Sequence, residues 1–300
     1  MTSNSISIVY VSHNVNQFPL EKWLSNFLTE PLVSEILVVD DNSETPVSIS
    51  KFPVIRNPYT MGLSASKRIG LLNVKSPVVL YVDNHCVFKS SNWGAKIVNE
   101  VLNNPKNIVC PSCLAHCESS FHGKLYGGSL DILENRRGYP VVFESRWNKN
   151  MPDNGIVECA MGETYALATD WHRKIDSFYG IKGYDLMGSI ALSVKTRLSG
   201  GKIVVLNLEA EQSFPRTTST NNPIASLYNK LRLAYVVFPP EIATTIPTIL
   251  GGSVGVKEAC NDFIKDFSDI VLEKDRFWEV CHASQKAASD KAGIKFNFIM

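Results

Sequence analysis

The stretch "SPVVLYVDNHC", residues 76–86, decides the fold. It begins as an apolar run typical of a buried strand, and it ends on Asp83, with His85 two residues further on. Residues i and i+2 of an extended segment project to the same side, so Asp83 and His85 could offer a carboxylate and an imidazole to one metal ion. Alone, these residues favour a simpler interpretation, in which an Asx turn closes the strand and His85 is exposed. The choice depends on the neighbouring segments.

Those segments alternate between strand-like and helix-like patterns. The strand-like runs end in polar residues, and apolar residues at helical spacing separate them. The segments are "SISIVYVSHN" (5–14), an amphipathic stretch (20–28), "EILVVDDNS" (35–43), and "FPVIRNPYTMGLSASKRIGLLNVK" (52–75), which combines a strand, a turn and a helix from Gly62. This order predicts an α/β fold with a mostly parallel, Rossmann-like sheet flanked by helices, and with ligands beyond the carboxyl ends of the strands.

Polar side chains gather at three successive predicted strand ends. They are Ser12 to Asn14, then Asp40 and Asp41, then Asp83 and His85. Helix and turn capping explains each group singly, but it explains the set poorly. The chain has neither a GxGxxG nor a P-loop sequence, so the standard phosphate cradles are absent.

Composition excludes several function classes. The 300 residues are 44% hydrophobic, enough for a full core, and the net charge of +1 provides no global field for nucleic acid or anionic membranes. No apolar run reaches the roughly 18 residues of a membrane span. The amino end reaches a strand too early for a secretory signal, so we expect a cytoplasmic protein.

The seven cysteines are an odd number in a chain too large to need disulfides, which favours reduced thiols. The cluster "CPSCLAHC", residues 110–117, places Cys110, Cys113, His116 and Cys117 at spacings that a zinc site could use. Four ligands within eight residues are cramped, however. Structural zinc is therefore an alternative to buried thiols.

The pattern loosens beyond residue 105. Residues 117–155 are rich in Gly, Asn, Arg and aromatics, as expected of an insertion that faces an acceptor. Ordered segments return from residue 156, and residues 216–300 are mainly helical with a turn-rich break at 239–253. We expect a catalytic domain over residues 1–215 and a helical carboxyl-terminal extension over 216–300 that packs on it.

The ordered motifs "VSHN", "VVDDNS", "GLSASKRIG" and "YVDNHC" resemble those of family 2 nucleotide-sugar glycosyltransferases with the GT-A fold. The "DNHC" motif followed by Trp93 is closer to the catalytic domain of the polypeptide N-acetylgalactosaminyltransferases. Further similar segments follow in the same order: "VVFESRW", "MGETYALATDWH", "GYDLMGSIALSVKTRLSGGKI" and "LYNKLRLAYVV". The resemblance covers roughly residues 5 to 240.

This resemblance implies transfer of a hexosyl or N-acetylhexosaminyl group from a nucleotide sugar, most simply a UDP-sugar, to a hydroxyl. Asp83 and His85 would hold Mn²⁺ or Mg²⁺, which neutralises charge on the departing diphosphate. Carried over by position, other residues would bind the donor: Ser12 and Asn14 beside the nucleoside, Asp40 or Asp41 as acceptors from the base, and Lys67 near the pyrophosphate. Lys67 could equally be a solvated helix residue.

Two departures from the family pattern bear on mechanism. Gly188 and Ser189 stand where family 2 enzymes carry an acidic pair, so the usual inverting base is missing. Asp185 or Glu163 could replace it, or the product could retain the anomeric configuration. Gln212 stands where the retaining relatives have a second metal-binding His. A catalytically degenerate module that only binds nucleotide sugar is the alternative.

The acceptor is open among a protein, a saccharide and a hydroxylated base of phage-type DNA. A basic, aromatic stretch gives local support for DNA, although it also fits a solvated loop. Its residues are Arg136, Arg137, Tyr139, Arg146, Trp147 and Lys149. A nucleotidyltransferase is disfavoured because a basic, glycine-rich amino-terminal loop is missing.

Overall fold

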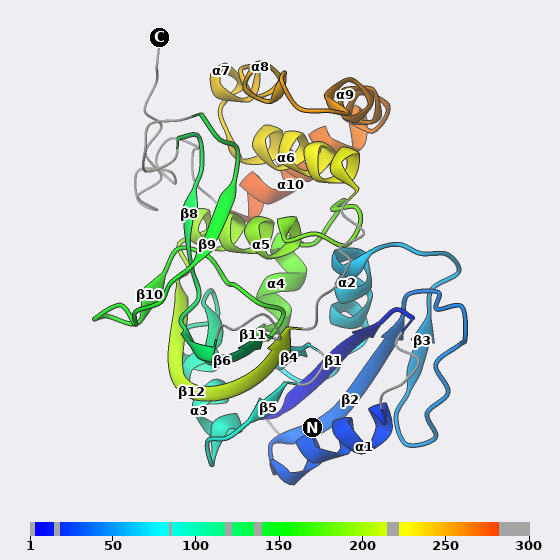
Figure 1. Ribbon diagram of the computed structural model, residues 1–300, viewed down its shortest axis with the longest axis vertical. Coiled ribbons are helices and arrows are strands. Elements are labelled where there is room, and N and C mark those ends of the chain that lie inside the picture. Colours follow the sequence, from blue (N-terminus) through cyan, green and yellow to red (C-terminus); the bar gives the residue numbers. More distant parts are fainter. Residues whose placement is uncertain are drawn as a thin grey trace.

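The computed structural model describes residues 4–14, 19–83, 86–117, 122–134, 140–214 and 222–281. A ten-stranded sheet lies below a helical layer (Figure 1). Its strands are β1 (Ile6–Ser12), β2 (Val33–Asp40), β3 (Val54–Arg56), β4 (Val78–Val82), β5 (Val87–Phe88), β6 (Ile108–Cys117), β7 (His122–Leu125), β10 (Ile156–Val157), β11 (Tyr165–Ala168) and β12 (Ile203–Phe214). The main path runs β10–β12–β6–β11–β4–β1–β2–β3.

The amino-terminal half of the sheet is parallel, as predicted. Strand β1 lies between β2 and β4, and β3 extends the sheet beyond β2. Every residue of β4 is buried, which explains its continuous apolar sequence. Helices α1 (Leu20–Ser25) and α2 (Leu63–Asn73), together with the 3-10 turn Asn26–Thr29, supply the crossover connections. The predicted α/β fold is therefore confirmed.

The other half of the sheet is mixed because β11 runs antiparallel to both β4 and β6. Tyr165 of β11 pairs with Tyr81 of β4. The residues that precede β11 therefore lie beside those that follow β4. This register brings Glu163 toward Asp83, although 80 positions separate them in the chain.

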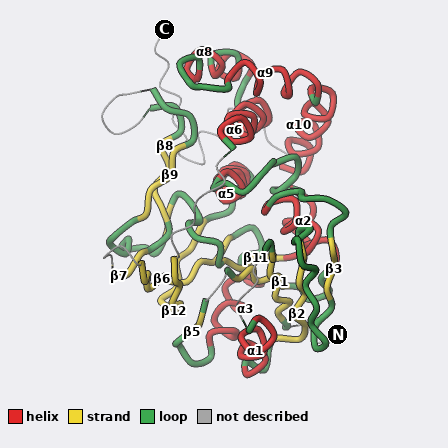
Figure 2. Tube along the Cα trace, turned by 45° about the vertical axis from the view of Figure 1, so that its right-hand side comes forward, coloured by secondary structure: helices red, strands yellow, loops and turns green. Residues whose placement is uncertain are grey.

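A helical layer covers one end of the sheet (Figure 2). It contains α5 (Met187–Leu198), α6 (Pro223–Val237), α9 (Val256–Lys265) and α10 (Phe267–Cys281), and α6 contacts the other three. The expected break at 239–253 instead forms two short helices, α7 (Pro240–Ala243) and α8 (Ile246–Leu250). Each has a proline in its first turn, where proline favours helix. The remaining helices are α3 (Trp93–Asn103) and α4 (Thr169–Ile175).

Buried charges tie three of these helices together. Arg232 of α6 is only 2% exposed, and its Nε and Nη2 donate to Glu273 (2.7 Å) and Asp269 (2.8 Å) of α10. Lys195 of α5 donates to the other oxygen of Glu273 (2.7 Å). Loss of one partner would leave a buried charge uncompensated, so this cluster fixes how the helices pack.

Residues between β6 and β11 form a separate antiparallel ribbon of β8 (Gly128–Asp131) and β9 (Glu144–Trp147). Leu130 and Phe143 of this region share one buried core with residues of α5, α6 and α10. The domain boundary at residue 215 stays a prediction. Among the described helices, none combines the length and apolar character needed to cross a membrane. The cytoplasmic location also stays a prediction.

His172 of α4 makes stability depend on pH. Its side chain is fully buried, neither ring nitrogen has a hydrogen-bond partner, and burial lowers its pKa from 6.5 to about 3. The unfolded chain binds a proton below pH 6.5 that the folded chain rejects, so this contribution is present above that pH and is lost as pH falls toward 3. We expect it to remove about 1.4 kcal/mol of unfolding free energy per pH unit in that window.

Urea unfolding of the wild type and His172→Leu at pH 7, 6 and 5 measures this term. The wild type should lose unfolding free energy relative to His172→Leu as the pH falls from 7 to 5. Parallel pH profiles would show that His172 has another environment.

Candidate active site

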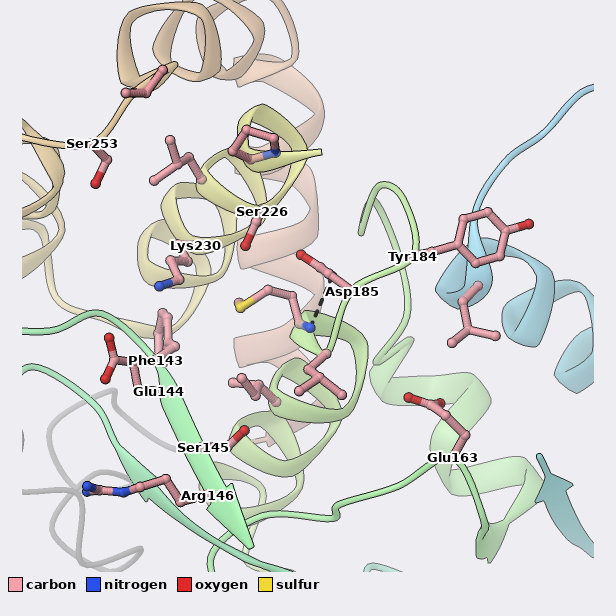
Figure 3. Close-up of a pocket in the computed structure, with 17 residues that line it drawn as sticks. Phe143, Glu144, Ser145, Arg146, Glu163, Tyr184, Asp185, Ser226, Lys230 and Ser253 are labelled. Carbon is pink, nitrogen blue, oxygen red and sulfur yellow. Dashed lines mark hydrogen bonds between the residues drawn. The ribbon is translucent and has the colours of Figure 1, made fainter. Parts of the chain in front are cut away.

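A cavity of about 890 Å³ lies where the helical layer meets the sheet (Figure 3). The start of α2, strand β9, the segment before α5, helix α6 and the loop after α8 supply its walls. Its lining includes Phe143, Glu144, Ser145, Arg146, Glu163, Tyr184, Asp185, Ser226, Lys230, Ser253 and Val254. Two predicted catalytic carboxylates, Glu163 and Asp185, thus line one cavity.

Glu163 forms an ion pair with Lys67 of α2 through its Oε2 atom. The Glu163 side chain is 18% exposed and that of Lys67 only 5%, so the pair lies at the inner wall of the cavity. The ammonium also donates to the Tyr165 hydroxyl (3.0 Å). Burial raises the pKa of Glu163, Lys67 lowers it, and the carboxylates of Asp83 and Asp185 raise it further, with a net increase.

Lys67 is therefore not the solvated helix residue of the simpler interpretation. It lies on the inner face of α2, with its ammonium 4.7 Å from the centre of the Tyr165 ring. The structure joins two residues that the sequence placed in separate roles, Lys67 with the pyrophosphate and Glu163 with the acceptor.

Asp185 lies at the start of α5, where its Oδ1 accepts from the Met187 main-chain N–H (3.1 Å; Figure 3). Asn229 of α6 donates to both carboxylate oxygens at 3.5 and 3.4 Å. Burial raises the pKa of Asp185, and the hydrogen bonds from Met187, Asn229 and Ser226 and the charge of Lys230 offset only part of this rise. These contacts hold the carboxylate at the cavity wall.

Asp83 follows β4, and its main-chain N–H donates to the Thr164 hydroxyl (3.3 Å). Its charge raises the pKa of Glu163 and of Tyr10, in each case after burial as the larger cause. Asp83 therefore belongs to the same acidic region as the cavity. Its predicted partner, His85, lies outside the described residues. Within the described ranges, no group of three metal-ligating side chains gathers at one point.

Asp40 and Asp41, predicted as acceptors from the base, accept hydrogen bonds from other groups of the chain. Asp40 accepts from the main-chain N–H groups of Ser43 (2.9 Å) and Val47 (3.2 Å) and from Arg56. Burial tends to raise the pKa of Asp40, but the hydrogen bonds from Ser43, Val47 and Arg56 outweigh it and lower the pKa.

The Asp41 carboxylate also accepts several hydrogen bonds from the chain. It accepts from the Asn57 side chain and from the main-chain N–H groups of Met61 and Gly62, each at 2.8 Å, and from the Tyr184 hydroxyl. An ionised carboxylate offers about four lone-pair sites, so these bonds use the capacity of Asp41. Both aspartates are fully buried, and their contacts form turns and anchor loops, whereas their role toward a base stays a prediction.

Ser12 and Asn14 lie at the carboxyl end of β1, as predicted. Ser12 is fully buried, and its carbonyl accepts from the Asp41 N–H (2.8 Å). Asn14 is exposed, has a left-handed backbone (φ 53°), and accepts from the Glu44 N–H (2.7 Å) through its side chain. Their roles toward a nucleoside stay predictions.

The departure at Gly188 has a packing reason. A Cβ at this position would lie 2.1 Å from the Ser64 hydroxyl oxygen, so α5 packs closely on α2 and a side chain there would require Ser64 to turn away. Ser189 is also buried. The contact between α5 and α2 thus lies where family 2 enzymes carry an acidic pair.

The described part of the cysteine cluster does not have the geometry of a zinc site. Cys110 and Cys113 are three residues apart on β6 and pack into different clusters, so they lie on opposite faces. Burial raises the pKa of the Cys113 thiol to about 12. The side chains of His116, Cys117 and Gln212, like Arg136, Arg137 and Tyr139, lie outside the described residues.

Sequence reasoning missed the cavity residues Ser226, Lys230 and Ser145. Lys230 lies on α6 in the motif "LYNKLRLAYVV", Ser226 lies on α6 just before that motif, and Ser145 lies in "VVFESRW". The sequence does contain a sign of these residues, because polar side chains interrupt otherwise apolar segments there. Only the packing of α6 and β9 against the same cavity makes that signal specific.

Comparison with known proteins gives a consistent assignment. The family model "Glycosyl transferase family 2" matches residues 7–161. The putative polypeptide N-acetylgalactosaminyltransferase 9 of Drosophila melanogaster is 24% identical over 196 residues, which cover 59% of this chain and 30% of that protein. The inactive polypeptide N-acetylgalactosaminyltransferase-like protein 5 of Mus musculus is 24% identical over 198 residues, 60% of this chain and 45% of that protein. The chain thus spans less than half the length of these relatives.

A crystal structure of GalNAc-T7 with UDP, GalNAc and Mn²⁺ superposes with a TM-score of 0.70 and 15% identity, over 96% of this chain and 57% of that chain. This likeness shows the GT-A fold. Because the family model covers more than half of the sequence, the protein belongs to glycosyl transferase family 2.

Proposed function

We propose that the protein transfers a sugar from a nucleotide sugar, most simply a UDP-sugar, to a hydroxyl acceptor. The single observation that carries this proposal is that Glu163 and Asp185 line one large cavity, while the β11–β4 register brings Asp83, at the carboxyl end of β4, toward Glu163. Ligands of open α/β sheets bind beyond these strand ends. The similar GalNAc-T7 structure contains UDP, GalNAc and Mn²⁺, which supports this donor class.

Asp83, with His85, is proposed to hold the divalent cation. A hard carboxylate suits Mn²⁺ or Mg²⁺, and the imidazole favours Mn²⁺. The surroundings fit a cation, because the strand register brings the Asp83 carboxylate toward that of Glu163. When bound, the metal would supply charge neutralisation for the departing diphosphate.

Between the two carboxylates, Glu163 is the better candidate to accept the acceptor's proton. Its Oε2 pairs with Lys67, whereas its Oε1 has no partner among the described residues. The Asp185 oxygens already accept from Met187 and Asn229. We assign Lys67 a positioning role toward Glu163, and Asp185 a role in orienting the acceptor. If the product retains its configuration, no such base is required.

The DNA acceptor has little support in the described residues. Arg146, one of its basic residues, already pairs with Asp131 across the β8–β9 ribbon. The degenerate alternative keeps one specific observation in its favour, the helix contact at Gly188 in place of an acid. One similar relative is also named as inactive.

Metal dependence tests the proposed role of Asp83 in binding the nucleotide-sugar donor. We expect Asp83→Asn to lower turnover by about 10²-fold or more, because a ligand to the charge-neutralising cation is lost. EDTA should have the same effect and Mn²⁺ should reverse it. Transfer can be followed by mass spectrometry with a panel of UDP-sugars. Full activity in EDTA would contradict the assignment of Asp83.

The base assignment has its own test. We expect Glu163→Gln to lower kcat by about 10²- to 10⁴-fold, the usual contribution of a general base. The exposed ion pair of Glu209 with Lys124 offers a control, and Glu209→Gln should change kcat little. NMR of the product gives its anomeric configuration. An inverted product formed by Glu163→Gln at the wild-type rate would defeat this role.

A further inference from the structure

The candidate active site contains a basic side chain without a partner in the described part of the chain. Among the described lining residues, only Arg146 and Lys230 are basic. Arg146 pairs with Asp131 across the β8–β9 ribbon. Lys230 of α6 is partly buried, and it takes part in no hydrogen bond or ion pair within the described residues. Its ammonium is therefore available to a ligand of the cavity.

Two carboxylates lie on either side of this ammonium. Glu144 of β9 and Asp185 line the same cavity, and Figure 3 shows Lys230 between them. Burial lowers the pKa of Lys230, while the charges of Glu144 and Asp185 raise it, with a net decrease. The three side chains thus influence one another across the cavity without pairing directly.

This row of charges favours an uncharged ligand. An anionic group would meet two carboxylates, and a cationic group would meet the ammonium. A hydroxyl is uncharged and both donates and accepts, so it can donate to Glu144 or Asp185 and accept from Lys230. Neighbouring hydroxyls of a sugar ring supply several such groups in a fixed arrangement.

The remaining walls suit a sugar ring. Ser145, Ser226 and Ser253 add short hydroxyl side chains, and Phe143 and Leu227 offer apolar surface to the C–H groups of the ring. Apolar walls with a few polar groups are usual for small-molecule sites, and the volume of about 890 Å³ lies within their range.

Asn229 holds part of this row in place. Its fully buried side chain accepts from the Lys182 main-chain N–H (2.9 Å) and donates to the Lys182 carbonyl (2.8 Å). It also donates to Asp185 at 3.5 and 3.4 Å. Because Asn229 precedes Lys230 on α6, one helix carries the ammonium and anchors the carboxylate. Such ordering before binding lowers the entropy cost of holding a ligand.

We propose that Glu144, Lys230 and Asp185 bind neighbouring hydroxyls of a sugar ring, and that Lys230 makes the cavity select an uncharged sugar. This inference rests on the proposed transfer function and adds the chemical group that its site recognises. The ring belongs to the sugar of the donor or to a saccharide acceptor, because both present the same hydroxyls. The experiments distinguish these two sources.

Calorimetry with Mn²⁺ tests the donor as the source. The ligands are UDP, UDP-glucose, UDP-galactose and the two N-acetylated forms. Lys230→Met should weaken the best UDP-sugar about tenfold, the loss of one hydrogen bond to a charged group, and leave UDP unchanged. Lys265→Met removes an exposed lysine that pairs with Asp262, and it should change neither affinity.

The full chain saturated with UDP and Mn²⁺ tests a saccharide acceptor. The probes are the methyl glycosides of the same four sugars, titrated by saturation-transfer NMR. A ring that belongs to the acceptor predicts that Lys230→Met weakens the best methyl glycoside about tenfold and leaves the UDP-sugars unchanged.

Ring charge gives a second readout in whichever series responds. A glucuronate ring is anionic and a glucosamine ring is cationic, and each replaces the uncharged ring on UDP or on the methyl glycoside. The wild type should bind the uncharged ring best. Lys230→Met leaves two carboxylates without the ammonium, so it should prefer the cationic ring. A merely structural role of Lys230 would not reverse this preference.

The outcomes separate this inference from the proposed function. Unchanged affinities in both series for Lys230→Met, with a thermal midpoint that shows it folded, overturn the inference and leave the nucleotide assignment standing. A wild type that binds a charged ring as tightly as the uncharged ring also overturns it, and this comparison needs no variant. Failure of the wild type to bind UDP with Mn²⁺ instead overturns the proposed function.

Discussion

The arrangement of the candidate active site depends on the hydrogen bonds of Asp41. This buried carboxylate follows β2 and accepts from Asn57, Met61 and Gly62, which lead into α2, and from Tyr184, which precedes α5. One side chain thus joins the sheet, the start of α2 and the segment that carries Asp185. Removing it would leave several buried donors without an acceptor, which is more costly than the loss of one exposed hydrogen bond.

Close backbone contacts complete this junction. A Cβ on Gly62 would lie 2.5 Å from the carbonyl oxygen of Gly183, and one on Gly188 would meet Ser64. These contacts draw α5 against α2, so Asp185 and Lys67 lie on two sides of the same region. Glu163 enters from β11, whose antiparallel register with β4 places it next to Asp83. The acidic region therefore results from backbone geometry at two independent junctions.

Much of the fold was readable from local pattern. The apolar runs at β1, β2 and β4 are buried in the way that their sequences predict, and the polar residues after them do gather at one edge. The particular roles were harder to predict, because Asp40 and Asp41 have the same residue type and position as a ligand-binding pair. Only their hydrogen bonds within the chain show that they also anchor loops. The Lys67–Glu163 pair joins residues 96 positions apart, and no local pattern predicts it.

The central claim is that a nucleotide and a divalent cation bind together beside Asp83. A second cavity of about 660 Å³, lined by Arg68, Lys182 and Asp266, offers a competing location. Anomalous diffraction from crystals grown with UDP and Mn²⁺ distinguishes the two. The account predicts a manganese peak about 2.2 Å from an Asp83 carboxylate oxygen, with the diphosphate on the same ion. A nucleotide in the second cavity, or a manganese peak remote from Asp83, would contradict it.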